Sequence, residues 1–234
     1  MKFEAQVTGI IQQNIGVASF RFSRPSELAY KPGQYMLVTL DIAGKEVMHP
    51  FSFSSSPTEE DFIEFTKKYS ESEYSLALKK LKIGDLIKID APYGQFTFMG
   101  EHPKISLLAG GIGITPFWSI CKYCTDTKLT ASIVLLYGCR NENEIIFYKE
   151  LEEMQIQNTN LKVFFVLSQA SSNWNGFSGT INADLIKSQI KDFQDRVFFA
   201  CGPPGMVFAM KNIISELGLP STQLKLESLI GHIG

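Results

Sequence analysis

The 234-residue sequence predicts an all-β domain followed by an α/β domain. In the first hundred residues, segments rich in β-branched and aromatic side chains are separated by clusters of Gly, Pro and Ser, which is typical of strands joined by turns. After Gly100, apolar strand-like runs alternate with helical patterns, which indicates a doubly wound parallel sheet. We therefore place the boundary near Gly100–Pro103 and expect domains at residues 1–100 and 101–234.

In the first half, short strands and frequent turn residues indicate an antiparallel barrel or sandwich. One helical stretch, Ser72–Leu81, interrupts the strands, with leucines at helical spacing and Gly84 just beyond its end. The expected strands are Phe3–Gly9, Ile15–Phe22, Tyr35–Ile42, Phe62–Lys68 and Leu86–Ala91.

In the second half, parallel strands would place a ligand at their carboxyl ends. The expected strands are Ile105–Leu108, Ile133–Tyr137, Val163–Leu167 and Val197–Ala200, and the expected helices are Phe117–Cys124, Ile145–Met154, Asn182–Ile190 and Met206–Glu216. The unusual residues of this half follow strands, at Gly110–Thr115, Gly138–Arg140, Ser168 and Cys201–Pro204. We therefore expect a binding site at this edge of the sheet.

Composition excludes several classes of function. A formal net charge of −2 gives no electrostatic basis for binding nucleic acid. Met1–Gln6 has no signal-peptide pattern, and the longest charge-free stretch, between Lys104 and Lys122, is short for a bilayer span. We expect a cytoplasmic protein with no transmembrane segment and with reduced thiols. Cys121 and Cys124 lie within one expected helix without a second ligand pair, so we expect helix packing and no metal site.

The run Ala109–Pro116 (AGGIGITP) joins a short apolar strand to a helix. Gly110, Gly111 and Gly113 can adopt positive φ and let the backbone approach a ligand closely. A helix N-terminus attracts anions, and Pro116 fits the first helical turn. The usual dinucleotide fingerprint has glycine at the position of Pro116. The run is therefore either a phosphate cradle or a glycine turn without a ligand.

Two segments of the first half carry candidate binding groups. Met48–Pro57 (MHPFSFSSSP) places an aromatic face beside small hydroxyl groups, which suits either a planar ring with a polar edge or a strand entering a serine turn. Ser75 lies near the start of the expected helix, where it suits either a phosphate or the capping of a surface helix. Lys67 would add positive charge there.

Two segments of the second half remain. Ala200–Met206 (ACGPPGM) presents Cys201 on a stiff loop, but no nucleophile signature surrounds it and the chain has only three histidines. We therefore favour a thiol that packs against a bound ring over a nucleophile. Trp174, in the loop Asn173–Gly179, is either a packing anchor or a ligand lid, and the anchor is favoured.

In their order and spacing, these segments resemble the ferredoxin–NADP reductase superfamily along almost the whole chain. The resemblance implies an antiparallel Greek-key flavin-binding barrel, followed by a domain that binds a nicotinamide nucleotide. The matching elements are PGQY at Pro32–Tyr35, HPFS at His49–Ser52, the pair Lys67 and Tyr69, Ser75, GD at Gly84–Asp85, PYGQF at Pro92–Phe96, GGIGITP, Tyr137–Arg140, Trp174–Gly179 and CGPPGM.

The resemblance also implies roles for individual residues. Phe51 would stack on the isoalloxazine ring of FAD, and Ser52 would hydrogen-bond near its hydride-accepting nitrogen. The implied FAD-binding residues are His49, Pro50, Phe51, Ser52, Lys67, Tyr69 and Ser75, with the last three at the ribityl and phosphate portion. The implied nucleotide-binding residues are Gly110, Gly111, Gly113, Thr115, Pro116 and Arg140, with Cys201, Gly202 and Pro203 bordering the nicotinamide. Ser52 and Cys201 are the implied catalytic residues.

Two departures from the family pattern bear on flavin binding. The flavin motif opens with His49 where the commoner version has Arg, and is similar to the version in NADPH oxidases and ferric reductases. His49 removes the bidentate phosphate clamp that Arg would provide, which leaves both a tightly bound and an exchangeable flavin open. The end of the sequence, Gly231–Gly234, also departs from relatives that end in an aromatic residue shielding the flavin, since no aromatic residue follows Phe208. Ile230, His232 or Ile233 would then shield the flavin, or the shield would be missing.

The sequence therefore predicts an FAD-dependent NAD(P)H oxidoreductase that passes electrons to a separate acceptor: a haem or iron–sulfur protein, a ferric species or free flavin. The alternatives are a reductase that uses free flavin as its substrate, and an electron-transfer subunit of a larger redox complex. NADH is favoured over NADPH because Ser168–Ala170 lacks the Arg or Lys that usually binds a 2′-phosphate. Lys187 or Arg140 would have to fold back to serve.

Overall fold

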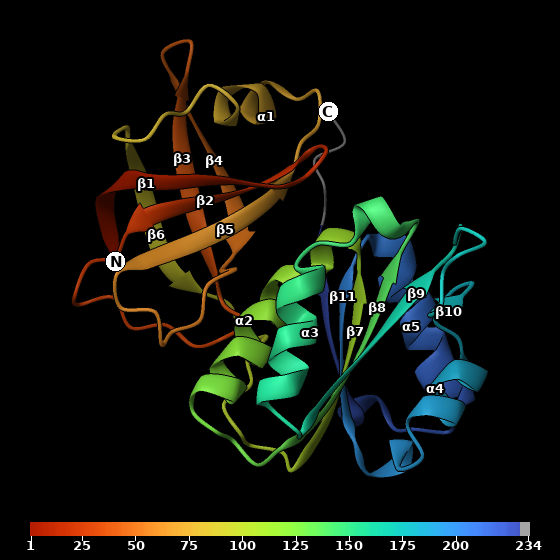
Figure 1. Ribbon diagram of the computed structural model, residues 1–234. Helices are drawn as coiled ribbons and strands as arrows, with labels where there is room; N and C mark the ends of the chain where they lie inside the picture. Colours follow the sequence, from red (N-terminus) through yellow and green to blue (C-terminus); the bar gives the residue numbers. More distant parts are fainter. Residues whose placement is uncertain (230–234) are drawn as a thin grey trace.

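The computed structural model describes residues 1–229 and contains two six-stranded sheets, one after the other along the chain (Figure 1). The first sheet is antiparallel, with the order β4-β3-β6-β1-β2-β5. Its strands are β1 (Lys2–Asn14), β2 (Val17–Ser23), β3 (Tyr35–Ile42), β4 (Lys45–Ser52), β5 (Phe62–Lys68) and β6 (Leu86–Tyr93). A bridge between Phe53 and Phe65 joins the two ends of the sheet, so it closes into a barrel. The predicted all-β domain is confirmed.

Aromatic rings fill the barrel. Phe20 and Phe22 both stack on Phe65, with ring centroids 5.2 and 5.5 Å apart. The short helix α1 (Glu73–Leu78) lies over one end of the barrel (Figure 1), and the Ser72 side chain caps it by accepting the Ser75 N–H. This helix ends three residues before the predicted Leu81.

The second sheet is entirely parallel, with the order β10-β9-β8-β7-β11-β12. Its strands are β7 (Lys104–Gly110), β8 (Ser132–Cys139), β9 (Leu161–Leu167), β10 (Phe177–Ser178), β11 (Val197–Gly202) and β12 (Leu224–Ser228). The helices are α2 (Ile114–Asp126), α3 (Tyr148–Gln157), α4 (Ala183–Gln189) and α5 (Pro204–Glu216), with 3₁₀ turns η1 (Gly111–Gly113), η2 (Glu142–Glu144), η3 (Phe193–Asp195) and η4 (Ser221–Gln223).

Both faces of this sheet are buried. Leu107 packs in a cluster with Phe117 of α2, whereas the next residue, Leu108, packs with Met210 of α5. Figure 1 shows α2 and α3 on one face and α4 and α5 on the other. The predicted doubly wound sheet is therefore confirmed, and its strands are apolar on both sides because helices cover both sides.

Some predicted bounds are wrong for identifiable reasons. The helix expected from Ile145 begins at Tyr148, because Phe147 has a left-handed backbone (φ 60°) and its ring is buried as part of the connection. The edge strands β10 and β12 were not predicted, since one has only two residues and the other is short and partly polar.

The barrel and the parallel-sheet domain share an apolar joint. Val17 and Phe96 of the first hundred residues belong to the same buried cluster as Phe117 and Phe199. The Phe96 ring centroid lies 5.7 Å from that of Phe117 and 5.4 Å from that of Phe199. Ser119 of α2 completes the joint by donating a hydrogen bond to a barrel carbonyl. The joint holds β4 and β5 beside the carboxyl ends of the parallel strands (Figure 1).

The structure also bears on the thiols and on membrane association. All four cysteines are free and buried. Cys121 and Cys124 pack inside the α2 core, and burial raises the pKa of Cys124 to about 12. Residues 1–229 contain no cluster of side chains placed to hold a metal ion. Over the same residues, no helix has the length and apolar character that crossing a bilayer requires.

Candidate functional site

The barrel side of the predicted site is the end of β4, which carries His49, Pro50, Phe51 and Ser52. Pro50 is tolerated because β4 lies at the end of the sheet order, where a missing N–H costs least. Phe51 is half-buried and stacks on Phe65 with ring centroids 4.3 Å apart. One face of the Phe51 ring is thus supported by the core, as stacking on a flat ligand ring requires.

His49 and Ser52 have different surroundings. Successive side chains alternate along a strand, so His49 shares the face of Phe51 whereas Ser52 points the other way. The His49 ring stacks on the buried Tyr74 ring with centroids 4.0 Å apart. Ser52 is buried at 7% exposure, opposite Tyr35 of β3.

Lys67 is a sheltered cation near the end of β5. Its side chain is half-buried, burial lowers its pKa, and no carboxylate in residues 1–229 pairs with it. A cation removed from water without a partner favours an anionic ligand. Tyr69 follows on the same side, and β5 contacts the glycine turn η1. The two predicted phosphate-binding segments therefore lie next to each other.

Ser75 has a structural partner. It is fully buried, and its hydroxyl accepts the Ser70 N–H at 2.9 Å. The side chain thus stabilises the turn before α1, whereas the residue that caps the helix is Ser72. A contact between Ser75 and a phosphate stays a prediction.

The hydroxyl groups of Ser54, Ser55 and Ser56 do not line a ligand surface. All three residues are buried. Ser54 Oγ donates to Glu64 Oε1 at 2.9 Å, Ser55 Oγ accepts the Glu64 N–H at 3.0 Å, and the Ser55 carbonyl accepts a hydrogen bond from Ser119 at 2.7 Å. The Ser54 and Ser55 hydroxyls are thus bonded to Glu64 within the barrel, which favours the alternative of a strand that enters a serine turn.

The three glycines after β7 differ in their roles. Only Gly111 has positive φ (52°), whereas φ is −125° at Gly110 and −65° at Gly113, so the expectation of positive φ is wrong at those two. A Cβ on Gly113 would lie 2.4 Å from the Cys201 carbonyl oxygen, whereas a Cβ on Gly111 would meet nothing within 4 Å. Gly113 thus permits contact between two loops, and Gly111 leaves open space for a ligand.

The loop after β11 closes against this turn. A Cβ on Gly202 would lie 3.2 Å from the Gly110 Cα, and Pro203 precedes the first residue of α5. Thr115 is buried in the first turn of α2 and donates to the Ile112 carbonyl at 3.1 Å. Pro116 follows it in that turn. The predicted residues Gly110–Pro116 and Cys201–Pro203 therefore form one compact unit.

Cys201 is fully buried, and burial raises the pKa of its thiol well above the ordinary value. A protonated, inaccessible thiol does not act as a nucleophile. The structure adds a neighbour that the sequence analysis missed: Glu227 of β12 lies opposite Cys201 in the strand register. Its Oε2 atom has no hydrogen-bond partner in residues 1–229, and burial raises its pKa to about 7. The only sequence signal was an acid in a short alternating segment.

Arg140 lies just beyond β8 and is largely exposed. Its guanidinium forms an ion pair with Glu144 Oε1 at 3.7 Å, and Glu144 Oε2 also pairs with Lys68 at 3.1 Å. Glu144 thus joins the end of the barrel strand β5 to the loop after β8. The positive charge of Arg140 is partly balanced before any nucleotide binds.

Trp174 is held as an anchor. Its indole N–H donates to the Phe177 carbonyl at 3.2 Å, and its ring covers Gly176 so closely that a Cβ there would lie 2.6 Å from it. It borders a cavity of about 510 Å³ beside Tyr148 and Phe165. The predicted roles of Ile230, His232 and Ile233 fall outside the described residues.

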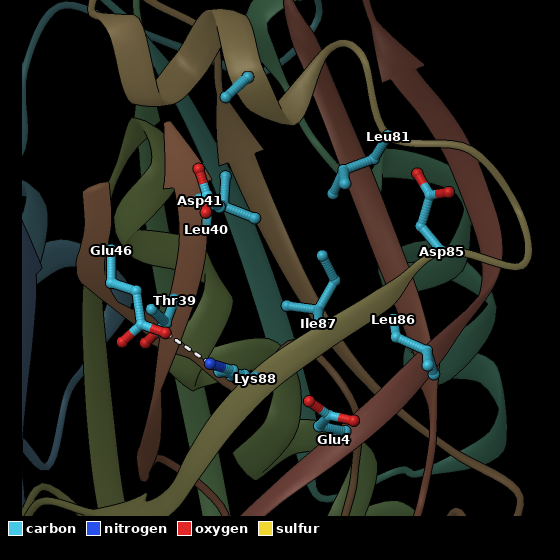
Figure 2. A pocket seen from close by; sticks show the side chains of 11 residues that line it. Glu4, Thr39, Leu40, Asp41, Glu46, Leu81, Asp85, Leu86, Ile87 and Lys88 are labelled. Atoms are coloured by element: carbon cyan, nitrogen blue, oxygen red, sulfur yellow. Dashed lines mark hydrogen bonds and ion pairs between the residues drawn. The ribbon is translucent and has the colours of Figure 1, made fainter. Parts of the chain in front are cut away.

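A second cavity, of about 460 Å³, lies between β3, β6 and α1 (Figure 2). Lys88 and Glu46 pair across its wall, beside the acidic residues Asp41 and Glu4. It contains none of the predicted site residues, so it is separate from the groups at the joint.

Comparisons with known proteins agree with this arrangement. Residues 4–98 match the family described as the oxidoreductase FAD-binding domain, and residues 107–212 match the oxidoreductase NAD-binding domain. The chain is 32% identical over 222 residues to NADH-cytochrome b5 reductase 1 of Aspergillus terreus, covering 89% of this chain and 74% of that protein.

Two further proteins are similar over most of this chain. The glycine betaine monooxygenase reductase subunit of Chromohalobacter salexigens is 27% identical over 94% of this chain, which spans 62% of that subunit. The FAD/NAD-binding domain of nitric oxide dioxygenase from Vibrio cholerae shares the fold, with a TM-score of 0.87 at 21% identity, covering 97% of this chain and 98% of that domain.

Proposed function

Since this chain belongs to the ferredoxin–NADP reductase superfamily and is an FAD-dependent NAD(P)H reductase, we propose that it uses NADH and passes the electrons to a separate redox protein. Bound FAD supplies the redox chemistry, by accepting a hydride from the nicotinamide and releasing electrons onward. The observation that carries the proposal is the contact between the glycine turn η1 and β5, whose Lys67 has no ion-pair partner among residues 1–229.

The proposed division of labour follows the two sheets. Residues 1–100 hold the flavin and residues 101–234 hold the nicotinamide nucleotide. The barrel ends with β6 at Tyr93 and the parallel sheet begins with β7 at Lys104, on either side of the proposed boundary. The two family matches also end and begin on either side of it.

On the flavin side, Phe51 stacks on the ring, backed by Phe65. Ser52 would hold the reacting part of the flavin ring, and His49 and Pro50 would continue the contact along β4. Lys67, Tyr69 and Ser75 serve the ribityl and phosphate portion. The half-buried ammonium of Lys67 supports this assignment, because burial without a partner favours an anion.

On the nucleotide side, Gly111 leaves room for the diphosphate beside the start of α2, where the helix dipole favours negative charge. The other residues of this group are Gly110, Gly113, Thr115, Pro116 and Arg140. Cys201, Gly202 and Pro203 border the nicotinamide, with Cys201 as a protonated thiol that shapes the pocket rather than a nucleophile.

We favour NADH because the loop after β9 has no lysine or arginine for a 2′-phosphate at the position where NADPH-binding relatives usually have one. Ser168–Ala170 has none, Arg140 is paired with Glu144, and Lys187 lies in the last turn of α4. For the acceptor, we propose a redox protein, since the names of two relatives refer to cytochrome b5 and to a monooxygenase.

The second candidate function is a reductase that uses free flavin as its substrate. It is favoured by His49, which stacks on Tyr74 where the commoner motif has an Arg clamp for phosphate. Loss of FAD during gel filtration, together with turnover of added FAD or FMN, would favour it over the first candidate.

The test is an absorbance spectrum of the purified protein, followed by anaerobic titration with NADH and with NADPH. We expect a flavin spectrum that survives gel filtration and is bleached by one equivalent of NADH. A protein that binds no FAD even when FAD is added, or a flavin that neither nucleotide reduces, would contradict the proposed function.

A further inference from the structure

The loops after β8 and β9 are joined at the carboxyl edge of the sheet. The Ser168 N–H donates to the Cys139 carbonyl at 3.1 Å, and the Gln169 N–H donates to the Arg140 carbonyl at 2.8 Å. In an open parallel sheet, a dinucleotide lies across this edge. In the proposed site, which has the diphosphate at η1 and the nicotinamide beside β11, the adenosine half would extend over the ends of β8 and β9.

Glu142 of η2 is fixed between these two loops. Its Oε1 accepts the Ser171 N–H at 2.8 Å, so a residue that follows β8 is held by the loop that follows β9. Hydrogen bonds from Ser171 also lower the pKa of the Glu142 carboxyl, which keeps it ionised at neutral pH. The carboxylate is therefore both charged and held in place.

Neighbouring charges leave Glu142 without a cation. Arg140 and Lys68 both pair with Glu144, and no ion pair joins Glu142 to a lysine or arginine in the described part of the chain. Two carboxylates and two cations thus balance at this end of the site. Replacing Glu142 with a neutral residue would leave one net positive charge.

We propose that Glu142 determines the choice of nucleotide, by accepting the ribose hydroxyl of NADH and repelling the 2′-phosphate of NADPH. This inference rests on the proposed nucleotide site at the edge of the parallel sheet. A carboxylate accepts hydrogen bonds from hydroxyl groups, but its charge opposes a phosphate dianion within a few ångströms. Glu142 would thus disfavour NADPH at a site where Ser168–Ala170 lacks the Arg or Lys that usually binds the 2′-phosphate.

The test compares Glu142→Gln with Glu153→Gln. The glutamine oxygen can still accept the Ser171 N–H, so the substitution removes charge without removing the hydrogen bond. Glu153 is exposed on α3, and its substitution removes the same charge elsewhere in the domain. Both variants are measured for kcat/KM with NADH and NADPH, and for competitive inhibition by 5′-AMP and by 2′,5′-ADP.

For Glu142→Gln, we expect kcat/KM with NADPH to rise about tenfold and kcat/KM with NADH to change less than about twofold. The inhibition constant for 2′,5′-ADP should fall by a similar factor, while that for 5′-AMP stays nearly constant. Added salt should weaken the discrimination against 2′,5′-ADP in the unmodified protein more than in the variant, since screening acts on the charge that the variant lacks.

An unchanged ratio of 2′,5′-ADP to 5′-AMP binding in Glu142→Gln would overturn the inference, as would an equal shift in Glu153→Gln. The inhibitor ratio separates this outcome from failure of the proposed function. An unmodified protein that prefers NADPH would contradict the NADH assignment, yet the effect of Glu142→Gln on the inhibitor ratio would still decide the role of Glu142.

Discussion

Substituting Gly113 with alanine should destabilise the protein strongly, although it adds only one methyl group. The new Cβ would lie 2.4 Å from the Cys201 carbonyl oxygen, 2.6 Å from its carbon and 2.7 Å from the Gly202 Cα. Ordinary contacts begin near 3.4 Å, so the two loops would have to separate by about 1 Å. Backbone atoms in a packed core do not yield at low cost, and overpacking of this kind costs about 3 kcal/mol.

For a chain of this length, such a loss lowers Tm by roughly 6 to 12 °C. Gly111→Ala is the matched control, because a Cβ there meets nothing within 4 Å. The only cost is the strain of an alanine in a left-handed backbone conformation, about 1 kcal/mol. Thermal unfolding followed by circular dichroism, together with calorimetric titration of 5′-ADP, separates the two variants. Gly111→Ala should weaken 5′-ADP binding while lowering Tm less than Gly113→Ala does. A Gly113→Ala protein as stable as the Gly111→Ala protein would refute the reasoning.

Three further predictions concern other parts of the site. Phe51→Ala should weaken FAD binding about tenfold by removing the stacked ring, as measured by the fluorescence of released flavin, whereas Phe208→Ala, at an exposed ring on α5, should not. His49→Arg should slow the dissociation of bound FAD, as measured by flavin fluorescence after dilution, because a guanidinium can hold a phosphate with two hydrogen bonds; an unchanged dissociation rate would show that the missing clamp is unimportant. Glu227 has a folded-state pKa of about 7 against 4.5 unfolded, so its contribution to stability is full below pH 4.5 and is lost as the pH rises through 7. In the Glu227→Gln variant, the free energy of unfolding should therefore depend less on pH. At pH 8 it should exceed that of the unmodified protein by up to about 3 kcal/mol, as measured by urea denaturation at a series of pH values.

The two-domain fold was accessible from the sequence because its signals are local. Runs such as Ile105–Leu108 are apolar on both faces, and the regular return of helical patterns between them leaves few other architectures. Gly111 and Lys67 were also singled out from local context, Gly111 as part of a glycine turn before a helix and Lys67 as a cation that would add positive charge near Ser75.

The features that the sequence did not reveal depend on contacts between distant segments. Gly113 is a glycine because Cys201, far along the chain, lies against it. Ser54 and Ser55 are buried because Glu64 and the second domain cover them. Glu227 becomes a buried acid only when β12 pairs with β11. None of these neighbours can be read from spacing in a single sequence.

The apolar joint has a consequence for exchanging parts between reductases of this fold. Phe96 and Phe98 precede Gly100, yet their rings pack against Phe199 in the core of the nucleotide domain. A chimera cut at Gly100 would supply these two rings from one parent and their pocket from the other. The unit that can be transplanted therefore begins before Phe96 and ends after β12, and a donor nucleotide domain should bring its own version of both aromatic residues.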